Sequence, residues 1–160
     1  MSQVRKFKVH SRLSRLALGR GGVTVVEALQ QASAALEEIR PPCIAMVDEC
    51  LAEIDQRFGP MAPNRANEPL ADLYSLSSCI IDVSGALPNS GMDQAANALC
   101  ELVDLTISSE RVGWVAFDVH IRALHLLRSH GASLSEERRR AVISGLREVV
   151  IKRFGPVEAA

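Results

Sequence analysis

The chain has 160 residues, of which 48% are apolar and 23% are charged, with a net charge of -1. That length suits a single domain, and that balance excludes a wholly disordered chain because enough apolar side chains are present to form a core. Aromatic residues make up only 4%, so the core must be built from aliphatic side chains, which favours helices over a β-sandwich.

Basic side chains crowd the N-terminus. Residues 1–20 carry six lysines and arginines and no acid, whereas residues 41–110 carry eleven acids and two arginines. The breaker "GRGG" at 19–22 then indicates that residues 1–22 form a basic N-terminal arm. This arm is either a solvated tail or a contact arm, for an acidic partner or for the acidic middle of its own chain.

Membrane insertion and secretion are not expected from this sequence. The N-terminus lacks the apolar stretch of a secretory signal, and no apolar run approaches the roughly 20 residues that cross a bilayer. We therefore expect a cytoplasmic protein that does not contact membranes.

A first helix is predicted from Thr24, because Thr24 and Glu27 have the spacing of a capping box. The apolar stripe of this helix consists of Val25, Ala28, Leu29, Ala32, Leu36 and Ile39. Pro41 and Pro42 interrupt the stripe, and the apolar pattern then resumes as far as Phe58. The sequence leaves open whether this stretch forms two helices or one long helix with a kink.

Four further helices are predicted at about 69–87, 92–108, 114–129 and 134–154. The first of these carries an apolar seam with heptad spacing, formed by Leu73, Leu76, Ile80, Val83 and Leu87. The last begins with a second capping-box spacing, between Ser133 and Glu136.

Short links between these helices favour antiparallel packing. The turn "PNSG" makes the helices on either side of it antiparallel neighbours. The sequence thus predicts an all-α protein, an antiparallel four-helix bundle with one or two additional helices over residues 23–155, followed by a tail over 156–160.

Two glycines in the stretch 76–104 resemble those of histidine phosphotransfer (HPt) domains. In that family a helix carries roughly His-x-x-Lys-Gly, and a second glycine begins the next helix. Setting Gly85 and Gly91 on these two glycines puts Ile81 at the position of the phospho-accepting histidine and Ser84 at that of the lysine. The resemblance implies an HPt-like helical core that lacks the reactive histidine.

Gly85 raises a separate question, because glycine in a helix costs about 1 kcal/mol relative to alanine. We therefore expect a reason for this glycine in the fold, such as the close approach of a neighbouring backbone.

The helix phase places Ile81 about 100° from Ile80, at the shoulder of the buried seam, where a side chain is both anchored and reachable. Isoleucine has no nucleophile and Ser84 has no charge, so phosphotransfer through this position is not expected. Asp82 is adjacent but lacks the acidic cluster and Mg²⁺ site of aspartyl phosphorylation. The predicted partner-binding face consists of Ser77, Ser78, Ile81, Asp82, Ser84, Gly85 and Pro88.

Over a longer span the chain resembles the small bacterial chemotaxis proteins of the CheE family. The segments that carry the resemblance are "SRL" followed by "GGVTVVEAL", then "LYSL", "IIDVSGAL" and "ALCELVD", and the stretch "WVAFDVHIRALHLLR". The resemblance implies a non-catalytic component of chemotaxis or two-component signalling that binds a response regulator or a chemotaxis kinase. The alternative is a structural helical protein that forms a homodimer or larger oligomer through the same face and the basic arm.

Other candidate sites have simpler interpretations. The four cysteines, Cys43, Cys50, Cys79 and Cys100, lie in apolar helical pattern without a C-x-x-C pair, which indicates core thiols in a reducing compartment. A metal site or a disulfide is the lesser alternative.

The histidines also have a simpler interpretation. His120 and His125 lie about 140° apart on a helix, so one metal cannot readily use both. Structural or surface roles are expected for the histidines, with a displaced phospho-acceptor as the alternative.

The remaining motifs argue against catalysis and cofactor binding. No phosphate-binding loop, nucleophile elbow or zinc-protease motif occurs, so we expect no enzyme activity, no cofactor and no metal. Arg138–Arg140 is interpreted as a solvated helix face. Nucleic acid is not an expected partner because phosphate would repel the acidic middle of the chain.

Overall fold

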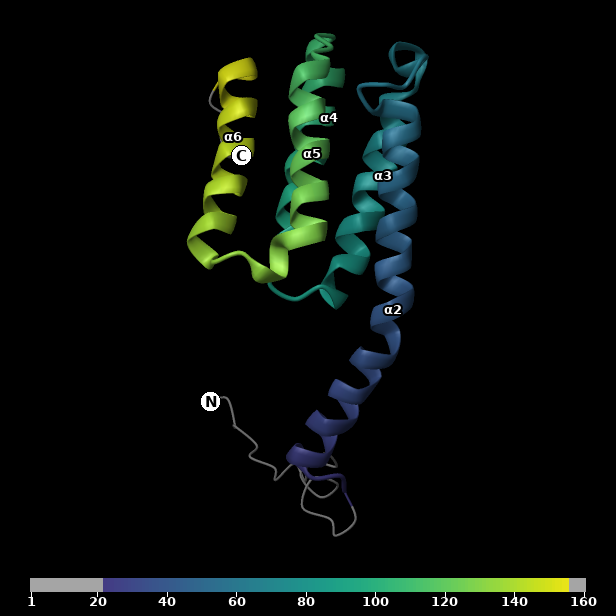
Figure 1. The fold of residues 1–160 in the computed structure, drawn as a ribbon, viewed down its shortest axis with the longest axis vertical. Coiled ribbons are helices and arrows are strands. Elements are labelled where there is room, and N and C mark those ends of the chain that lie inside the picture. The colour runs from purple at the N-terminus through teal and green to yellow at the C-terminus, as the bar shows by residue number, and fades with distance from the viewer. Residues whose placement is uncertain (1–21, 156–160) are drawn as a thin grey trace, which may run out of the picture. The chain divides into compact units, whose positions relative to one another are not determined.

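The computed structural model of the chain describes residues 22–155, and it is helical throughout its regular structure (Figure 1). Two compact units are distinguished, Met1–Leu36 and Glu37–Ala160. The basic arm and the tail, residues 1–21 and 156–160, lie outside the described residues, so the division of the chain proposed at those points stays a prediction.

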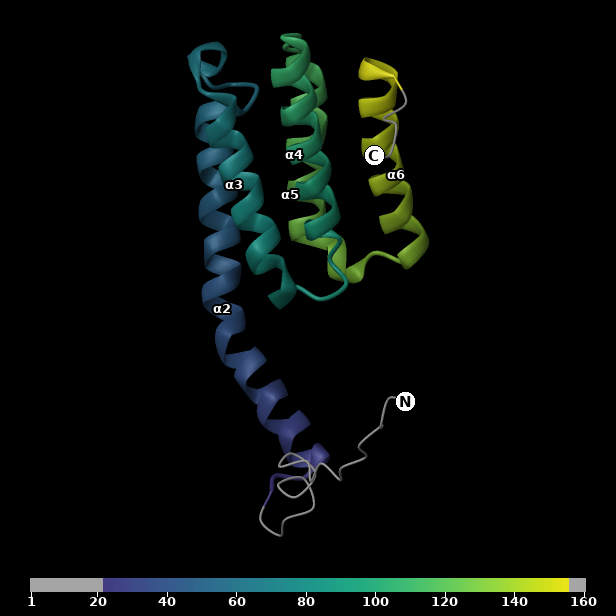
Figure 2. The same cartoon turned by 180° about the vertical axis from the view of Figure 1, so that it is seen from behind.

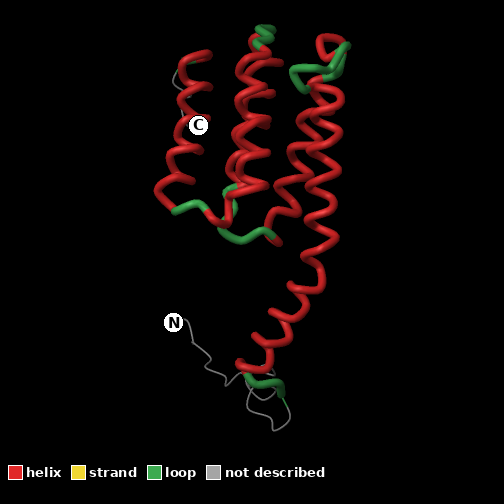
Figure 3. The backbone as a smooth tube through the Cα atoms, viewed as in Figure 1, coloured by secondary structure: helices red, strands yellow, loops and turns green. Residues whose placement is uncertain are grey.

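Five α-helices make up the described part of the chain, which contains no strand (Figure 3). They are α2 (Val25–Phe58), α3 (Leu70–Val83), α4 (Met92–Ser109), α5 (Trp114–His130) and α6 (Glu136–Phe154). Three short 3-10 turns lie between them, at Arg65–Asn67, Ser84–Ala86 and Gly131–Ser133. The all-α prediction is therefore confirmed. No helix in residues 22–155 is long and apolar enough to cross a membrane.

Helix α2 begins with the capping box that the sequence predicts. The Thr24 N–H donates to the Glu27 carboxylate at 2.9 Å, and the Glu27 N–H donates to the Thr24 hydroxyl at 3.2 Å. The helix then continues through Pro41 and Pro42. Both prolines are exposed, so water can satisfy the carbonyl groups that lose their helical partners. Of the two interpretations left open by the sequence, one long helix is the one observed.

The core of the second unit is built around α4, which packs against α3, α5 and α6. Consecutive helices from α3 to α6 run in opposite directions, as the two opposite views show (Figures 1 and 2). The residues that recur at helical spacing along the inner face of α4 are all buried: Leu99, Leu102, Val103 and Thr106. The second half of α2 joins this core through Val47, Cys50, Leu51, Ile54 and Phe58.

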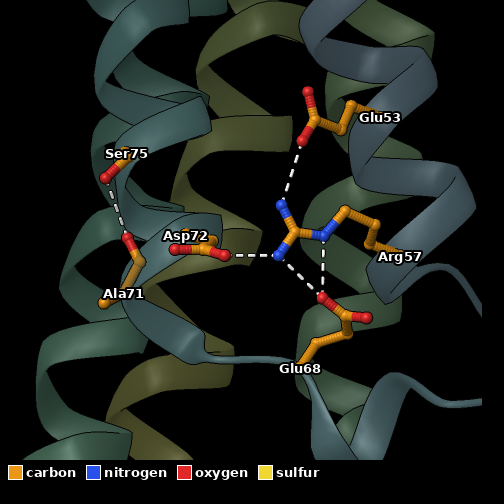
Figure 4. Close-up of polar contacts among 6 residues, drawn as sticks. All are labelled: Glu53, Arg57, Glu68, Ala71, Asp72 and Ser75. Atoms are coloured by element: carbon orange, nitrogen blue, oxygen red, sulfur yellow. Dashed lines mark hydrogen bonds and ion pairs between the residues drawn. The ribbon is translucent and has the colours of Figure 1, made fainter.

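Arg57 links the end of α2 to the start of α3 through hydrogen bonds (Figure 4). Its guanidinium donates to Glu53 at 3.0 Å, to Glu68 at 2.7 Å, and to Asp72. These hydrogen bonds raise the pKa of Arg57, and the bond to Asp72 contributes most. The same view shows the Ser75 hydroxyl donating to the Ala71 carbonyl within α3, at 2.9 Å. One arginine thus closes the loop between the two helices.

Polar side-chain contacts also link α2 to α5. Arg128 donates to both carboxylate oxygens of Asp48, at 2.7 and 2.8 Å. One turn of α5 earlier, the His125 ring lies 2.9 Å from a carboxylate oxygen of Asp55. These contacts fix the register of the two helices from the solvent side.

Two helix ends differ from the sequence-based expectations. Helix α3 ends at Val83, not at Leu87, because the chain tightens into a 3-10 turn at Ser84. Helix α6 is capped by Ser135 rather than Ser133, since the Ser135 hydroxyl accepts from the Arg138 N–H at 3.3 Å. Ser133 instead lies in a 3-10 turn, where its hydroxyl donates to the His130 carbonyl at 2.8 Å.

The inner face of α6 consists of three aliphatic residues. Ile143, Leu146 and Val150 are its buried residues, whereas Ala141 is exposed. The interpretation of Arg138–Arg140 as solvated is wrong for Arg139. Its side chain is only 13% exposed and donates to the Gly131 and Leu134 carbonyls, at 3.1 and 2.9 Å.

The two glycines of the HPt-like pattern have different structural reasons. Gly91 has a φ of +75°, a left-handed conformation that side chains with a Cβ adopt only at a cost. Gly85 has no neighbouring atom within 4 Å of the position that a Cβ would occupy. The expectation that a close backbone requires glycine at Gly85 is therefore wrong.

Replacing Gly91 by alanine should lower the free energy of unfolding by about 1–2 kcal/mol, the usual cost of the left-handed conformation. Gly85→Ala is the matched control, and its effect should stay within about 0.5 kcal/mol because its Cβ would meet open space. Urea unfolding followed by circular dichroism measures both values. Equal losses in the two variants would show that backbone conformation does not distinguish these positions.

Candidate functional site

Ile81 lies half-buried in the last full turn of α3. Its neighbour Ile80 points into the core and is fully buried, so the helix phase leaves Ile81 at the edge of the core as predicted. The side chain lines a surface hollow of about 310 Å³ together with residues from α4 and α6. We call this the Ile81 hollow; it is lined by Ile81, Asp93, Gln94, Asn97, Ala98, Glu101 and Arg147.

Local hydrogen bonds fix the backbone beside Ile81. The Ser84 N–H bonds to the carbonyls of Ile80 and Ile81, and its hydroxyl donates to the Ile81 carbonyl at 2.8 Å. These bonds end α3 and turn the chain toward α4. The Met92 N–H then bonds to the Ser90 hydroxyl at 3.3 Å, within the turn that leads into α4.

The lining of the Ile81 hollow mixes apolar and polar side chains, and its charged residues include more acids than bases. Asp93 and Glu101 contribute carboxylates from α4, and Arg147 contributes a guanidinium from α6. None of these three side chains forms an ion pair with another residue in the part of the chain that the structure describes. The hollow therefore combines the apolar Ile81 with three charged side chains, unpaired within the described residues, which we call the rim residues.

The predicted face is not presented as one surface. Ser77 is fully buried, and its hydroxyl donates to the Leu73 carbonyl at 2.7 Å. Ser84 is also buried, because its hydroxyl bonds back to its own helix. Including these two serines in an exposed face is wrong, because both side chains are buried and bond to carbonyls of α3.

The other members of the face are accessible. Ser78 is half-buried, whereas Asp82, Gly85 and Pro88 are exposed. Pro88 does not line the Ile81 hollow; it lines a separate hollow with Leu87 and Leu127. Partner binding through these residues stays a prediction. We define the Ile81 face as the accessible residues Ser78, Ile81, Asp82 and Gly85 together with the rim residues Asp93, Glu101 and Arg147.

The rim residues were missed by reasoning from the sequence. Asp93 and Glu101 follow the turn after α3, and helix pairing alone places them across from Ile81. Arg147 comes from α6, far along the chain, and no local pattern connects it to Ile81.

The histidines occupy three different environments. His120 is fully buried, and its Nδ1–H donates to the Ala116 carbonyl at 2.8 Å. Burial lowers the pKa of this imidazole, and its Nε2 has no hydrogen-bond partner within the described residues. A phosphoryl donor cannot reach a buried nitrogen, so His120 is removed from the candidate phospho-acceptors. His125 is paired with Asp55, and His130 is exposed.

The four cysteines are free thiols. Cys50 and Cys100 are buried, whereas Cys43 and Cys79 are half-buried, so the interpretation as core thiols holds fully for two of them. Burial, with a smaller effect of the neighbouring Cys79 thiol, raises the pKa of Cys50 to about 12. Burial likewise raises the pKa of Cys100 to about 11. Both thiols are therefore protonated and weakly nucleophilic at neutral pH. Residues 22–155 contain no group of three or more metal-ligating side chains that could hold a metal ion.

Comparisons of the chain with protein-family models, with curated proteins and with solved structures find no match. The resemblances to HPt domains and to the CheE family therefore stay predictions. What stands independently of them is a fold whose described residues form only helices and turns, in which Ile81 is accessible at a hollow between α3, α4 and α6.

Proposed function

We propose that the chain is a non-catalytic signalling protein that binds a response regulator or a chemotaxis kinase through the Ile81 face. The observation that carries the proposal is the position of Ile81, half-buried in the hollow where the HPt-like pattern would place an imidazole. An isoleucine can fill a partner's pocket but cannot accept a phosphoryl group. The HPt-like, antiparallel four-helix arrangement of α3 to α6 belongs to the same proposal.

The charges of the face indicate what the partner should present. The face carries one positive charge, from Arg147, and three carboxylates, from Asp82, Asp93 and Glu101. Like charges repel across an interface, so the surface that contacts this rim should be basic. HPt domains carry a lysine at the position of Ser84, so their face has a positive charge that this chain lacks. The partner surface that suits this face should therefore be more basic than the one that suits an HPt domain.

Replacing Ile81 by aspartate should weaken binding to the response regulator or kinase at least about tenfold, because a carboxylate would be buried at the centre of the contact. Isothermal titration calorimetry measures the dissociation constant against each candidate partner. Ile107→Asp is the matched control: Ile107 is 51% exposed near the C-terminal end of α4, so the same substitution there should leave binding unchanged.

Incubation with a response regulator carrying labelled phosphate tests the non-catalytic part of the proposal. No label should transfer to the chain, since Ile81 offers no nucleophile. Label on the chain, or equal weakening of binding by the two aspartate variants, would contradict the proposal.

A further inference from the structure

Helix α2 carries a row of exposed apolar side chains in the first unit, between Val25 and Leu36. Val25, Leu29 and Leu36 are 76%, 63% and 53% exposed, and the smaller Ala32 between them is also exposed. Water contact with such a row is unfavourable, and contiguous exposed apolar surface usually marks an interaction site. We call these four residues the α2 row.

The spacing of the α2 row is that of a coiled coil. Its members follow each other at intervals of four, three and four residues, which is the repeat of the a and d positions in a heptad. Val26, Ala28 and Ala35 lie beside the row and widen its apolar face. A row with this spacing can pack against the row of another helix.

The residues beside the row favour an identical helix as that partner. The flanking positions are occupied by Val26, Ala28, Ser33 and Ala35, which are uncharged and mostly small. Glu27 is the one charged residue between Val25 and Leu36, and its carboxylate is bonded back to Thr24. Two copies can therefore approach closely without like charges facing each other, whereas charges at these flanking positions are what normally select a different partner.

We propose that the α2 row is a self-association surface, occupied by the α2 row of a second copy of this chain. A two-fold axis would let each row pack against its equivalent. The segment spans about three turns, or roughly 18 Å, so the contact is smaller than the roughly 800 Å² per partner of a stable interface. The dimer should therefore be reversible, and this proposal does not depend on the function of the Ile81 face.

Sedimentation equilibrium of the full chain, over roughly 5 to 500 µM, measures the self-association directly. The wild type should pass from monomer to dimer within this range. Leu29→Glu should raise the dimer dissociation constant at least about tenfold, because it places two carboxylates in the seam. Gln30→Glu is the matched control: it adds the same charge at a neighbouring exposed position about 100° away, off the seam, and should leave the constant unchanged.

Circular dichroism should show the same helix content in both variants, since leucine, glutamine and glutamate have similar helix propensities. A wild type that stays monomeric throughout, or a dimer that persists in Leu29→Glu, would overturn the proposal. A form lacking residues 1–20 should dimerise as the full chain does. A dimer that becomes about tenfold tighter without residues 1–20 would show that the chain's own N-terminus covers the row, and would overturn the proposal as well.

Discussion

Replacing Phe117 by alanine should lower the free energy of unfolding by about 3–5 kcal/mol, which is a large part of the stability of a typical domain. Phe117 is fully buried on α5, and its ring lies 5.5 Å from that of Trp114. Few side chains of comparable size are present, because aromatic residues make up 4% of the chain.

The small core residues of α4 and α5 bear on the size of this loss. Five of the buried residues of these two helices are alanines: Ala95, Ala96, Ala98, Ala116 and Ala123. Alanine side chains have no rotamers through which they could fill the vacated space, so the loss should lie toward the upper end of the usual range.

Denaturant unfolding followed by circular dichroism measures the loss. Val115→Ala is the control, because Val115 lies on the same helix but is 77% exposed, and its effect should stay within about 0.5 kcal/mol. A loss below 1 kcal/mol for Phe117→Ala would contradict the placement of α5 against α4.

The stability of the fold should decrease with acidification through the buried imidazole of His120. Burial lowers the pKa of His120 in the folded state below its ordinary value of 6.5. The unfolded chain therefore binds a proton at a higher pH than the folded chain does. Stability from this group is fully present above pH 6.5 and falls by up to about 1.4 kcal/mol per pH unit below it, until the folded-state pKa is reached.

His120→Leu should remove this part of the pH dependence. Leucine has no titrating group, and it also replaces an imidazole whose Nε2 lacks a partner within the described residues. We therefore expect stability at pH 7.5 to change little, and the loss between pH 6.5 and 5 to be smaller than in the wild type. Unfolding free energies of both forms at a series of pH values measure the difference. Identical pH profiles would mean that His120 does not resist protonation in the folded chain.

The inner face of α4 could be predicted from the sequence because it is set by periodicity alone. Leu99, Leu102 and Val103 recur at helical spacing, and all are buried in the structure. The capping box at Thr24 was predictable for a similar reason, since both partners lie within one turn.

Periodicity did not reveal which apolar stripe is buried against other helices of the same chain. The stripe of α2 has the same spacing before and after its prolines, yet Leu29 is exposed and Ile54 is fully buried. Tertiary packing decides that difference, and the sequence of α2 alone does not indicate it. Position 133 shows the same limit at a helix end: Ser133 and Ser135 are both suitable caps, and the 3-10 turn before α6 decides between them.

The part of the candidate site on α3 and the turn after it was predictable, because helix phase fixes Ile81 at the edge of the core and leaves Ser78, Asp82 and Gly85 accessible. Ser77 and Ser84 were assigned to the surface because spacing places them near Ile81, but each hydroxyl bonds to its own helix and is buried. Arg147 reaches the hollow from α6, so its role depends on how distant helices pair.

Binding through the Ile81 face is tested most directly by nuclear magnetic resonance of the labelled chain during titration with a response regulator or a chemotaxis kinase. We expect the largest amide shift changes at Ser78, Ile81 and Asp82 and at the rim residues of α4, with little change between Val25 and Leu36. Shift changes confined to other helices, or none with any of these partners, would contradict a docking role for this face.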